Sequence, residues 1–506
     1  MRIKKAFYNI ITSSILQVVT LVCGLILPRL ILSYYGSAYN GLVSSIVQYL
    51  DYISILTLGL AGSVRVAIYQ AKATDNITKI SSALKSYQNH MNRIGIAFFI
   101  YLIILMFIYP FIVKDEFNRF DVITLIAIIG MTTFAEYFWA STCQQFLLAN
   151  QSLYVANIIE IIARIVSTII SILLIINGFS IQLVKLLSSF CFVIGPISLN
   201  YITYKKYGII RKIAPDENAL KNRKDVLANS IANTIHASSD IFLLTIFQSA
   251  KVISVYTVYT FVFSALTKIL GIFTSGLEGA FGEIWAKQDK KLFRETFNTF
   301  EFLVLLFVSI VFSTTAMLIL SFIKIYTNGI NDINYIIPVF AYLSVISYGI
   351  YCIRVPYVTA VQAAGKYKET KIGAMIEAGL NFSCSLILVK PLGLVGVVIG
   401  TLTANCFRTI QYSIFVSKNL IERSMKFFIK RIFWLLICVT SIMTLYFLTS
   451  LSKWDVASYR DWIIKAIVCM CLSIIITLFF AFLFFRKDTY NGISLFLKMV
   501  KMKKKQ

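Results

Sequence analysis

Long apolar stretches follow one another along almost the whole chain, separated by short polar turns. Each reaches the length of roughly 20 residues that an α-helix needs to cross the hydrocarbon core of a bilayer. None alternates apolar and polar residues as a membrane β-strand does. Backbone groups in lipid must be satisfied within such a segment, so the stretches are predicted to be helices. They cover residues 7–33, 41–69, 92–113, 121–148, 153–176, 181–204, 226–247, 252–280, 298–323, 334–361, 371–390, 393–417, 431–450 and 462–485.

The composition places these helices in a membrane. Of the 506 residues, 58% are hydrophobic and 14% are charged, whereas soluble domains are about half apolar and about a quarter charged. We therefore predict an all-α polytopic membrane protein with about 14 transmembrane helices. The first apolar stretch resembles a signal peptide, but it is too long for one and has no small-residue cleavage site before Pro28. It is expected to remain as the first helix.

The formal net charge of +25 acts as a topology signal. With the N-terminus in the cytoplasm, about 33 of the 48 Lys and Arg residues fall in cytoplasmic segments, as the positive-inside rule requires. Both termini are therefore predicted to be cytoplasmic. The same charge is expected to attract anionic membrane lipids, and nucleic acid is not expected as a partner.

Two basic stretches divide the chain. Residues 205–224 carry seven Lys and Arg after the sixth apolar stretch, and residues 418–431 follow the twelfth. Similar small-residue turns within residues 35–42 and 247–256 suggest that the two six-helix halves are parallel repeats. The predicted organisation is an N-lobe (1–204), a basic cytoplasmic linker (205–225), a C-lobe (226–417), a C-terminal helix pair (418–485) and a basic cytoplasmic tail (486–506).

Motifs of enzymes and metal sites do not occur in the sequence. It contains no GxxxxGK[ST], HExxH or GxSxG pattern. All nine cysteines fall in apolar stretches without paired CxxC motifs, so neither zinc nor disulfide bonds are expected. We predict a protein that is not an enzyme, has no cofactor, and depends on substrate gradients, ion gradients or the membrane potential for transport.

Ionisable side chains inside the apolar stretches are costly and usually face a bundle interior or a watery cavity. The seventh stretch contains Asn229, Asn233, His236 and Asp240 at spacings that place all four on one helix face. A stripe of four polar side chains needs polar surroundings. His236 and Asp240 are therefore expected to line a cavity.

Lys268 and Arg354 lie deep in apolar stretches, with no acidic residue within one turn of their own helices. Cations in this position suggest an anionic ligand. A diphosphate head group carrying sugars would suit them, because Arg binds phosphate through two hydrogen bonds and Lys acts as a point charge. Tyrosines near these stretches could contact the sugars: Tyr256, Tyr259, Tyr348, Tyr351 and Tyr357.

Five further charged residues could couple transport to ions or simply hold the bundle together. Glu160 and Arg164 are four residues apart on one helix face, and we interpret them as a structural ion pair. Glu377 and Arg65 lie near cytoplasmic ends, where both could reach the interface. Glu136 and Arg408 are isolated within their stretches, and they complete the set.

Two segments resemble a known family. Leu27-Pro28-Arg29-Leu30-Ile31-Leu32-Ser33-Tyr34-Tyr35-Gly36, with Asn40-Gly41-Leu42, is similar to the opening of bacterial polysaccharide-export flippases. Ser239-Asp240-Ile241-Phe242-Leu243-Leu244, leading to Val255-Tyr256, resembles the start of that family's second half. These flippases translocate O-antigen and capsule repeat units, and they belong to the multidrug/oligosaccharidyl-lipid/polysaccharide exporter superfamily.

The resemblance implies a fold and a cargo. The fold would be two six-helix lobes around a central cavity plus two C-terminal helices, working by alternating access in the bacterial plasma membrane. The cargo would be an undecaprenyl-diphosphate-linked oligosaccharide, with polysaccharide polymerase and chain-length machinery as candidate partners. Cavity-lining cations of the first two helices of each lobe carry over to Arg29, Arg65 and Lys268.

Three alternatives stay open at this point. A peptidoglycan lipid-precursor flippase of the same superfamily would share the fold and the anionic cargo. A drug or cation antiporter of that superfamily fits less well, because such transporters usually stop at 12 spans and favour acids in the cavity. A membrane-bound glycan polymerase or acyltransferase would need a large outer loop, and the outer loops here are short.

Overall fold

The computed structural model is helical through nearly all the residues that it describes, which are 2–57, 60–73, 76–113, 117–216, 224–274 and 277–490. Each of the fourteen predicted stretches overlaps a helix. Within the described residues, twelve segments are long and apolar enough to cross a membrane. One of them, Phe7–Thr57, has 51 residues and is interrupted at Gly36, so it contains two helices. The prediction of an all-α polytopic membrane protein is confirmed.

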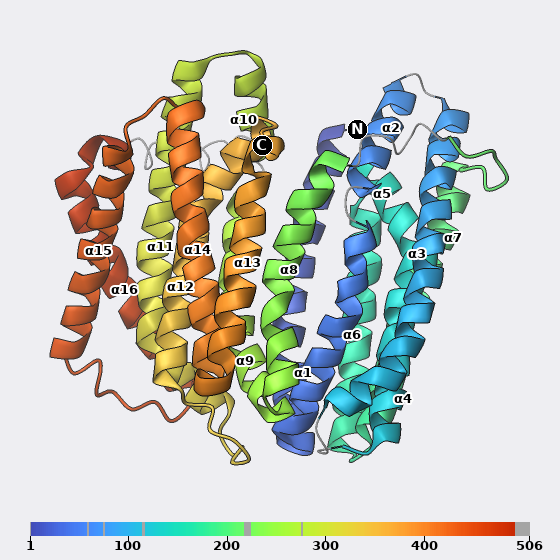
Figure 1. Cartoon of the computed structure of the whole chain (residues 1–506), viewed down its shortest axis with the longest axis horizontal. Coiled ribbons are helices and arrows are strands. Elements are labelled where there is room, and N and C mark those ends of the chain that lie inside the picture. The colour runs from blue at the N-terminus through green and yellow to red at the C-terminus, as the bar shows by residue number, and fades with distance from the viewer. Residues whose placement is uncertain are drawn as a thin grey trace. The chain divides into compact units, whose positions relative to one another are not determined.

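The chain folds into two compact units (Figure 1). The first contains Met1–Thr257 and Gly329–Ile333, and the second contains Val258–Asn328 and Asn334–Gln506. The division falls within the ninth helix and not in the basic stretch 205–224, because the eighth helix packs against the first. The predicted lobe boundaries, and the cavity between the lobes, stay predictions.

Buried aliphatic and aromatic side chains form the core of the first unit, with Phe98, Leu125 and Leu147 fully buried. Helix α6 packs against α1 and α7, and α4 also packs against α7. Asparagine and serine side chains cap the starts of α3, α4 and α7 by accepting backbone N–H groups. The elements are α1 (Arg2–Asp51), η1 (Tyr52–Thr57), α2 (Leu60–Ala73), α3 (Ile77–Ile112), α4 (Arg119–Ala135), η2 (Glu136–Ala140), α5 (Ser141–Ala149), α6 (Tyr154–Ile176), α7 (Ile181–Tyr207), α8 (Lys224–Phe247) and the start of α9 (Ala250–Thr274).

The second unit is a bundle in which α14 packs against α12 and α13, and α11 packs against α12 and α16. Hydroxyl groups join α11 to α16: Ser309 and Thr477 lie 2.8 Å apart, and Thr314 donates to Ser473 over 3.1 Å. Such bonds between helices are a common way to hold bundles together in lipid. Besides the rest of α9, the elements are α10 (Leu277–Ala286), α11 (Lys290–Tyr326), α12 (Pro338–Ala363), α13 (Tyr367–Leu392), α14 (Leu394–Asn419), α15 (Met425–Leu448) and α16 (Tyr459–Phe484).

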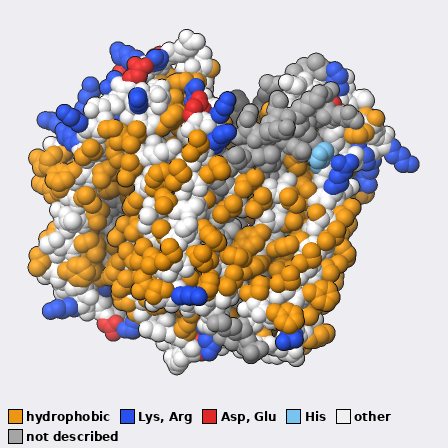
Figure 2. Space-filling model, viewed as in Figure 1, with side chains coloured by type: hydrophobic (Ala, Val, Ile, Leu, Met, Phe, Trp, Pro, Cys, Tyr) orange, Lys and Arg blue, Asp and Glu red, His pale blue; other side chains and the backbone are white. Residues whose placement is uncertain are grey.

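Apolar side chains cover the middle of the visible face of each unit, and Lys and Arg side chains gather toward the helix ends (Figure 2). Large residues are exposed in the described part of both units, among them Phe107 at 70% and Ile387 at 72%. Such a surface is costly in water and is stable in the hydrocarbon of a bilayer. The surface therefore agrees with the apolar length of the helices.

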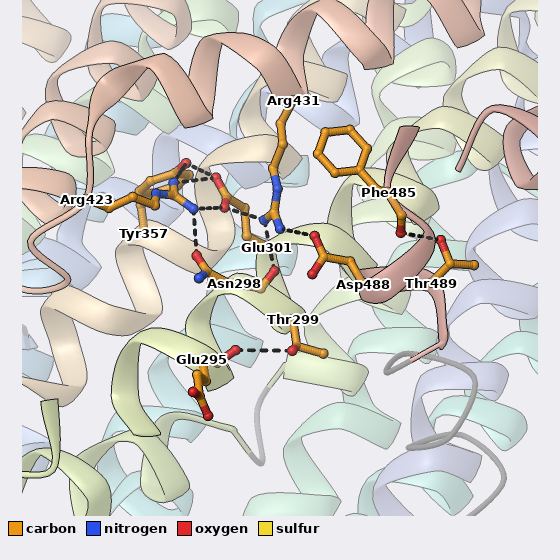
Figure 3. Close-up of polar contacts among 10 residues, drawn as sticks. All are labelled: Glu295, Asn298, Thr299, Glu301, Tyr357, Arg423, Arg431, Phe485, Asp488 and Thr489. Carbon is orange, nitrogen blue, oxygen red and sulfur yellow. Dashed lines mark hydrogen bonds and ion pairs between the residues drawn. The ribbon is translucent and has the colours of Figure 1, made fainter. Parts of the chain in front are cut away.

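A buried charge network anchors the C-terminal helix pair to α11 within the second unit (Figure 3). Glu301 of α11 is 2% exposed and accepts hydrogen bonds from Arg423, Arg431 and Tyr357. Its Oε2 lies 2.6 Å from Nη1 of Arg423 and 2.5 Å from Nη1 of Arg431. Arg431 also pairs with Asp488, beyond α16, at 2.8 Å.

Arg423 lies in the loop between α14 and α15. Burial lowers the pKa of this guanidinium, but the hydrogen bond and charge of Glu301 outweigh burial and raise the pKa above its ordinary value. Arg423 therefore stays charged, and one carboxylate holds two cations from different parts of the chain.

Glu301→Gln is expected to destabilise the protein strongly, because it leaves two buried arginines without their shared carboxylate. Loss of one partner of a buried ion pair costs about 3–5 kcal/mol. Thermal unfolding in detergent measures this loss. Glu422→Gln is the control: Glu422 forms an exposed ion pair with Lys290 at 2.7 Å, and such pairs contribute little. Equal unfolding temperatures for the two variants would contradict the anchoring role of Glu301.

Candidate functional site

Three of the predicted site residues meet in one buried cluster of the second unit. Arg354 comes from α12, Glu377 from α13 and Arg408 from α14, and they are 7%, 2% and 2% exposed. One carboxylate oxygen of Glu377 accepts a hydrogen bond from Nη1 of Arg354. The other lies 3.2 Å from Nε of Arg408. Glu377 therefore bridges two cations on the helices to either side of it along the chain.

Arg408 is held by further contacts in the bundle. Its Nη1 donates to the backbone carbonyl of Thr370 at 2.9 Å and to the side chain of Gln411 at 2.6 Å. Its Nη2 donates to the hydroxyl of Tyr412 at 3.0 Å, and the guanidinium lies 4.2 Å from the centre of that ring. With so many donors used, Arg408 serves to position Glu377 and join α13 to α14.

Arg354 lies at the edge of the cluster. Its guanidinium is 4.9 Å from the centre of the Tyr351 ring, and Tyr351 is 39% exposed. Two arginines and one glutamate give these three ionised side chains a net charge of +1. A buried excess of charge is costly unless an opposite charge comes near. Whether this charge attracts an anion to Arg354 stays a prediction.

Two sequence interpretations of this cluster were wrong. Arg354 does have an acidic partner, because Glu377 approaches it from the next helix, which a search within one turn of its own helix does not reach. Glu377 does not extend to the interface, because it is 2% exposed and fixed between two arginines. The roles of Arg354, Glu377 and Arg408 in transport stay predictions.

Lys268 lies on α9, in the part that belongs to the second unit. It falls within the candidate membrane span Ala250–Gly271, and its side chain is exposed. No described residue forms an ion pair with its ammonium group. The structure thus agrees with the expected unpaired cation in a membrane segment, while its contact with cargo stays a prediction.

Acidic residues gather in the first unit. The carboxylate of Glu136 interacts electrostatically with those of Glu160 and Asp51, and the side chains of Glu136 and Asp51 are exposed. Glu136 begins the π-helical turn η2, a feature that is frequent at functional sites. The predicted ion pair of Glu160 and Arg164 is confirmed, with a separation of 2.9 Å. Whether these acids couple transport to an ion stays a prediction.

Of the stripe predicted on the seventh apolar stretch, only the last member can be placed. Asp240 is 6% exposed and accepts a hydrogen bond from the Tyr256 hydroxyl at 2.9 Å. The side chains of His236, Asn229 and Asn233 lie outside the described residues. The cavity role of His236 and Asp240 therefore stays a prediction.

Arg29 and Arg65 are both half-buried in the first unit. Arg29 lies in the segment of α1 before Gly36, one residue after Pro28. Arg65 lies on α2, where its Nε donates to the carbonyl of Ala61 at 3.2 Å. The part of their side chains that is exposed leaves both able to contact cargo, which stays a prediction.

Two of the tyrosines suggested as sugar contacts are packed inside the second unit. Tyr259 and Tyr357 are fully buried. Tyr259 donates to the carbonyl of Tyr335 at 2.8 Å, and Tyr357 donates to Glu301. The suggestion was wrong for these two residues, because their hydroxyls satisfy buried acceptors. Tyr351, which is exposed and stacked on Arg354, remains a candidate.

Sequence reasoning missed the network around Glu301. Arg423 and Arg431 looked like ordinary members of a basic cytoplasmic stretch, and Glu301 looked like the polar start of an apolar one. A usable signal was present, because an acid within a long apolar helix needs a cation from elsewhere in the chain. The sequence could not identify which cations supply it.

An apolar groove of about 550 Å³ lies between α15 and α16 in the second unit. Its walls are aliphatic and aromatic, with three hydroxyl side chains along one helix. The lining residues are Thr440, Ser441, Thr444, Leu445, Ile475, Ile476, Phe479 and Phe480. The described residues contain no group of three His, Cys, Asp or Glu that could hold a metal ion.

Comparison with solved structures shows a shared fold. The lipid II flippase MurJ, in an inward closed conformation, aligns with a TM-score of 0.71 at 17% sequence identity, covering 94% of this chain and 98% of that chain. An inward-facing multidrug resistance MATE family transporter of the MOP superfamily aligns with a TM-score of 0.58 at 12% identity, covering 79% of this chain and 95% of its own. A eukaryotic MATE transporter aligns with a TM-score of 0.58 at 14% identity, covering 82% and 95%.

The sequence itself matches no protein-family model and no curated protein. The structural similarities lie at 17% identity or below, so they show the fold. This fold occurs in a flippase and in transporters.

Substitutions of Arg354 and of Glu377 are expected to lower the stability of the protein by different amounts. Arg354→Met leaves Glu377 paired with Arg408 and is expected to cost about 1 kcal/mol of stability. Glu377→Gln leaves two buried arginines without a carboxylate and is expected to cost about 3–5 kcal/mol. Thermal unfolding in detergent compares the variants. Equal losses, or a larger loss for Arg354→Met, would contradict the bridging role of Glu377.

Proposed function

We propose that this chain is a flippase that moves an undecaprenyl-diphosphate-linked oligosaccharide across the bacterial plasma membrane by alternating access, for the synthesis of cell-surface polysaccharide. Both termini would lie in the cytoplasm. The proposal rests on two cations of the second unit, Lys268 on α9 and Arg354 on α12, two membrane helices whose side chains contact each other.

Two ring contacts between α9 and α12 relate positions along one helix to positions along the other. The rings of Tyr259 and Phe340 lie 5.1 Å apart, and further along both helices the rings of Phe263 and Tyr348 stack at 4.9 Å. The order of these contacts means that the helices run in the same direction. At 1.5 Å per residue, Lys268 lies about 7.5 Å beyond Phe263, and Arg354 about 9 Å beyond Tyr348. By this estimate the two residues lie at similar heights along their helices, and in our proposal they bind the two phosphates of a diphosphate.

The second unit offers groups that suit each part of the cargo: the phosphates, the sugars and the polyprenyl chain. The Arg354 guanidinium can bind phosphate oxygens through two hydrogen bonds while the Lys268 ammonium adds a point charge. The exposed ring of Tyr351 beside Arg354 offers a surface for a sugar. The groove between α15 and α16 is apolar and open, as a long polyprenyl chain requires.

The C-terminal helix pair favours lipid-linked cargo over a small drug. The MATE transporters leave 18–21% of this chain uncovered, and the residues after Asn419 number 87 of 506, or about 17% of the chain. The lipid II flippase leaves 6% uncovered. The uncovered share of the MATE matches is thus close in size to the part of the chain that holds α15 and α16, and these two helices form the apolar groove.

A second candidate cargo is the peptidoglycan lipid precursor. The alignment with a lipid II flippase over 94% of this chain favours it. The opening segment from Leu27 to Gly36, which resembles the polysaccharide-export flippases, favours repeat units. Both cargoes carry the same polyprenyl diphosphate, so the proposed cation pair serves either, and the sugars decide between them.

Reconstituted vesicles test the proposal. The purified protein is expected to move a fluorescent undecaprenyl-diphosphate-linked oligosaccharide between leaflets, measured by loss of fluorescence to a reducing agent that cannot cross the membrane. Lys268→Ala is expected to slow this movement about tenfold or more, because a hydrogen bond to a charged group contributes roughly 1.5–3 kcal/mol. Lys268→Arg is expected to retain most of the rate.

Lys371→Ala is the matched control, because Lys371 is also an exposed lysine of the second unit, at the start of α13. It is expected to flip cargo as fast as the unmodified protein. An unchanged rate in Lys268→Ala would remove Lys268 from the cargo site. Competition between unlabelled lipid II and a repeat-unit lipid distinguishes the two cargoes.

A further inference from the structure

Helix α1 is broken at Gly36, near the membrane face opposite the predicted cytoplasmic N-terminus. Gly36 has φ 85° and ψ 175°, a conformation that is essentially restricted to glycine. A new helical segment therefore begins at Ser37, and its first backbone N–H groups need acceptors from outside the helix.

Asp332 supplies acceptors at this break. One carboxylate oxygen accepts the backbone N–H of Ser37 at 2.8 Å, and the other accepts the Ser37 hydroxyl at 2.6 Å. Asp332 belongs to a five-residue segment, Gly329–Ile333, that packs with the first unit. The helices before and after this segment, α11 and α12, belong to the second unit. This segment, here called the strap, is thus part of the first unit, although the helices on both sides of it belong to the second.

The segment of α1 after Gly36 packs tightly against the start of α9. Asn40 donates to the hydroxyl of Ser254 at 2.8 Å and is 4% exposed. Gly41 lies against the backbone of Ala250 so closely that a side chain at position 41 would collide with the carbonyl of Ala250. These contacts fix the segment after Gly36 to the start of α9, so Ser37 is a rigid anchor for the strap.

The two partners of the contact between Ser37 and Asp332 differ in their exposure to solvent. Ser37 is fully buried, whereas Asp332 is exposed. When the contact breaks, water can solvate the Asp332 carboxylate at once, whereas Glu301 and Glu377 are 2% exposed and would lose their partners without gaining water. The cost of opening falls on the buried N–H and hydroxyl of Ser37, which lose their acceptors. Asp332 therefore makes two short hydrogen bonds when the contact is closed and has a hydrated carboxylate when it is open.

We propose that Asp332 and Ser37 form a reversible clasp on the outer face, closed when the Asp332 carboxylate caps Ser37 and opened once in each transport cycle. This inference rests on the proposed alternating access of a flippase. Opening frees the α11–α12 connection from the break in α1, so that the outer ends of the helices can separate. Closing uses the pre-formed acceptor site at Gly36 and Ser37.

Two experiments test the clasp. In the first, Ser37→Cys and Asp332→Cys are combined and oxidised in the reconstituted protein. The cross-linked protein is expected to stop flipping and to recover when a reductant is added, and each single variant is expected to respond to neither treatment. Flipping by the cross-linked protein at the rate of its reduced form would overturn the proposal.

The second experiment needs no transport. Ser37→Cys in the full chain is treated from outside with a maleimide that cannot cross the membrane. Its labelling is expected to be slow and to become about tenfold faster when Asp332→Ala is added, since the loss of such contacts is worth roughly 1.4 kcal/mol or more. Ser45→Cys is the control, because Ser45 is 1% exposed on the same helix beside Tyr109. It is expected to stay unreactive in both backgrounds.

An unchanged labelling rate of Ser37→Cys in the Asp332→Ala background would overturn the clasp even if the unmodified protein flips its cargo. Faster labelling in a protein that moves no lipid would retain the clasp and refute the proposed function. The two ideas can therefore fail separately.

Discussion

A carboxylate buried in a membrane helix must find cations, and this constraint organises the second unit. Glu301 and Glu377 are each 2% exposed, and each is shared by two arginines from other segments. An unpaired buried charge would cost several kcal/mol, so the helices can pack only where these charges meet. Glu377 fixes the packing of α12, α13 and α14, and Glu301 fixes α15 and the segment after α16 against α11.

The two buried clusters around Glu301 and Glu377 differ in their charge balance. In our proposal the first is structural and the second also binds cargo. Around Glu301, two arginines are balanced by Glu301 and Asp488. Around Glu377, two arginines face one glutamate, and Arg354 lies at the edge beside an exposed tyrosine. The balanced cluster is complete in itself and ties the C-terminal pair to the bundle. In our proposal the cationic cluster attracts an anion, and together with Lys268 on the contacting helix α9 it forms the diphosphate site.

Much of the fold could be predicted because a helix that is surrounded by lipid needs a long apolar sequence, which can be recognised directly. All fourteen stretches overlap helices, and the pair of Glu160 and Arg164 followed directly from helical spacing. Contacts between helices could not be predicted in the same way. The partner of Arg354 comes from α13, and the acceptor of Ser37 lies 295 residues away in the chain. Spacing along one helix contains no information on either.

The central claim is that this membrane protein recognises the negative charge of a lipid-linked glycan. Native mass spectrometry of the intact protein measures it most directly, with the same oligosaccharide attached to undecaprenyl diphosphate or, without phosphate, to undecaprenol. The account predicts that the diphosphate lipid binds the protein much more tightly and that the uncharged lipid competes poorly. Equal binding of the two lipids would contradict it, because the cations of the second unit would then have no anion to recognise.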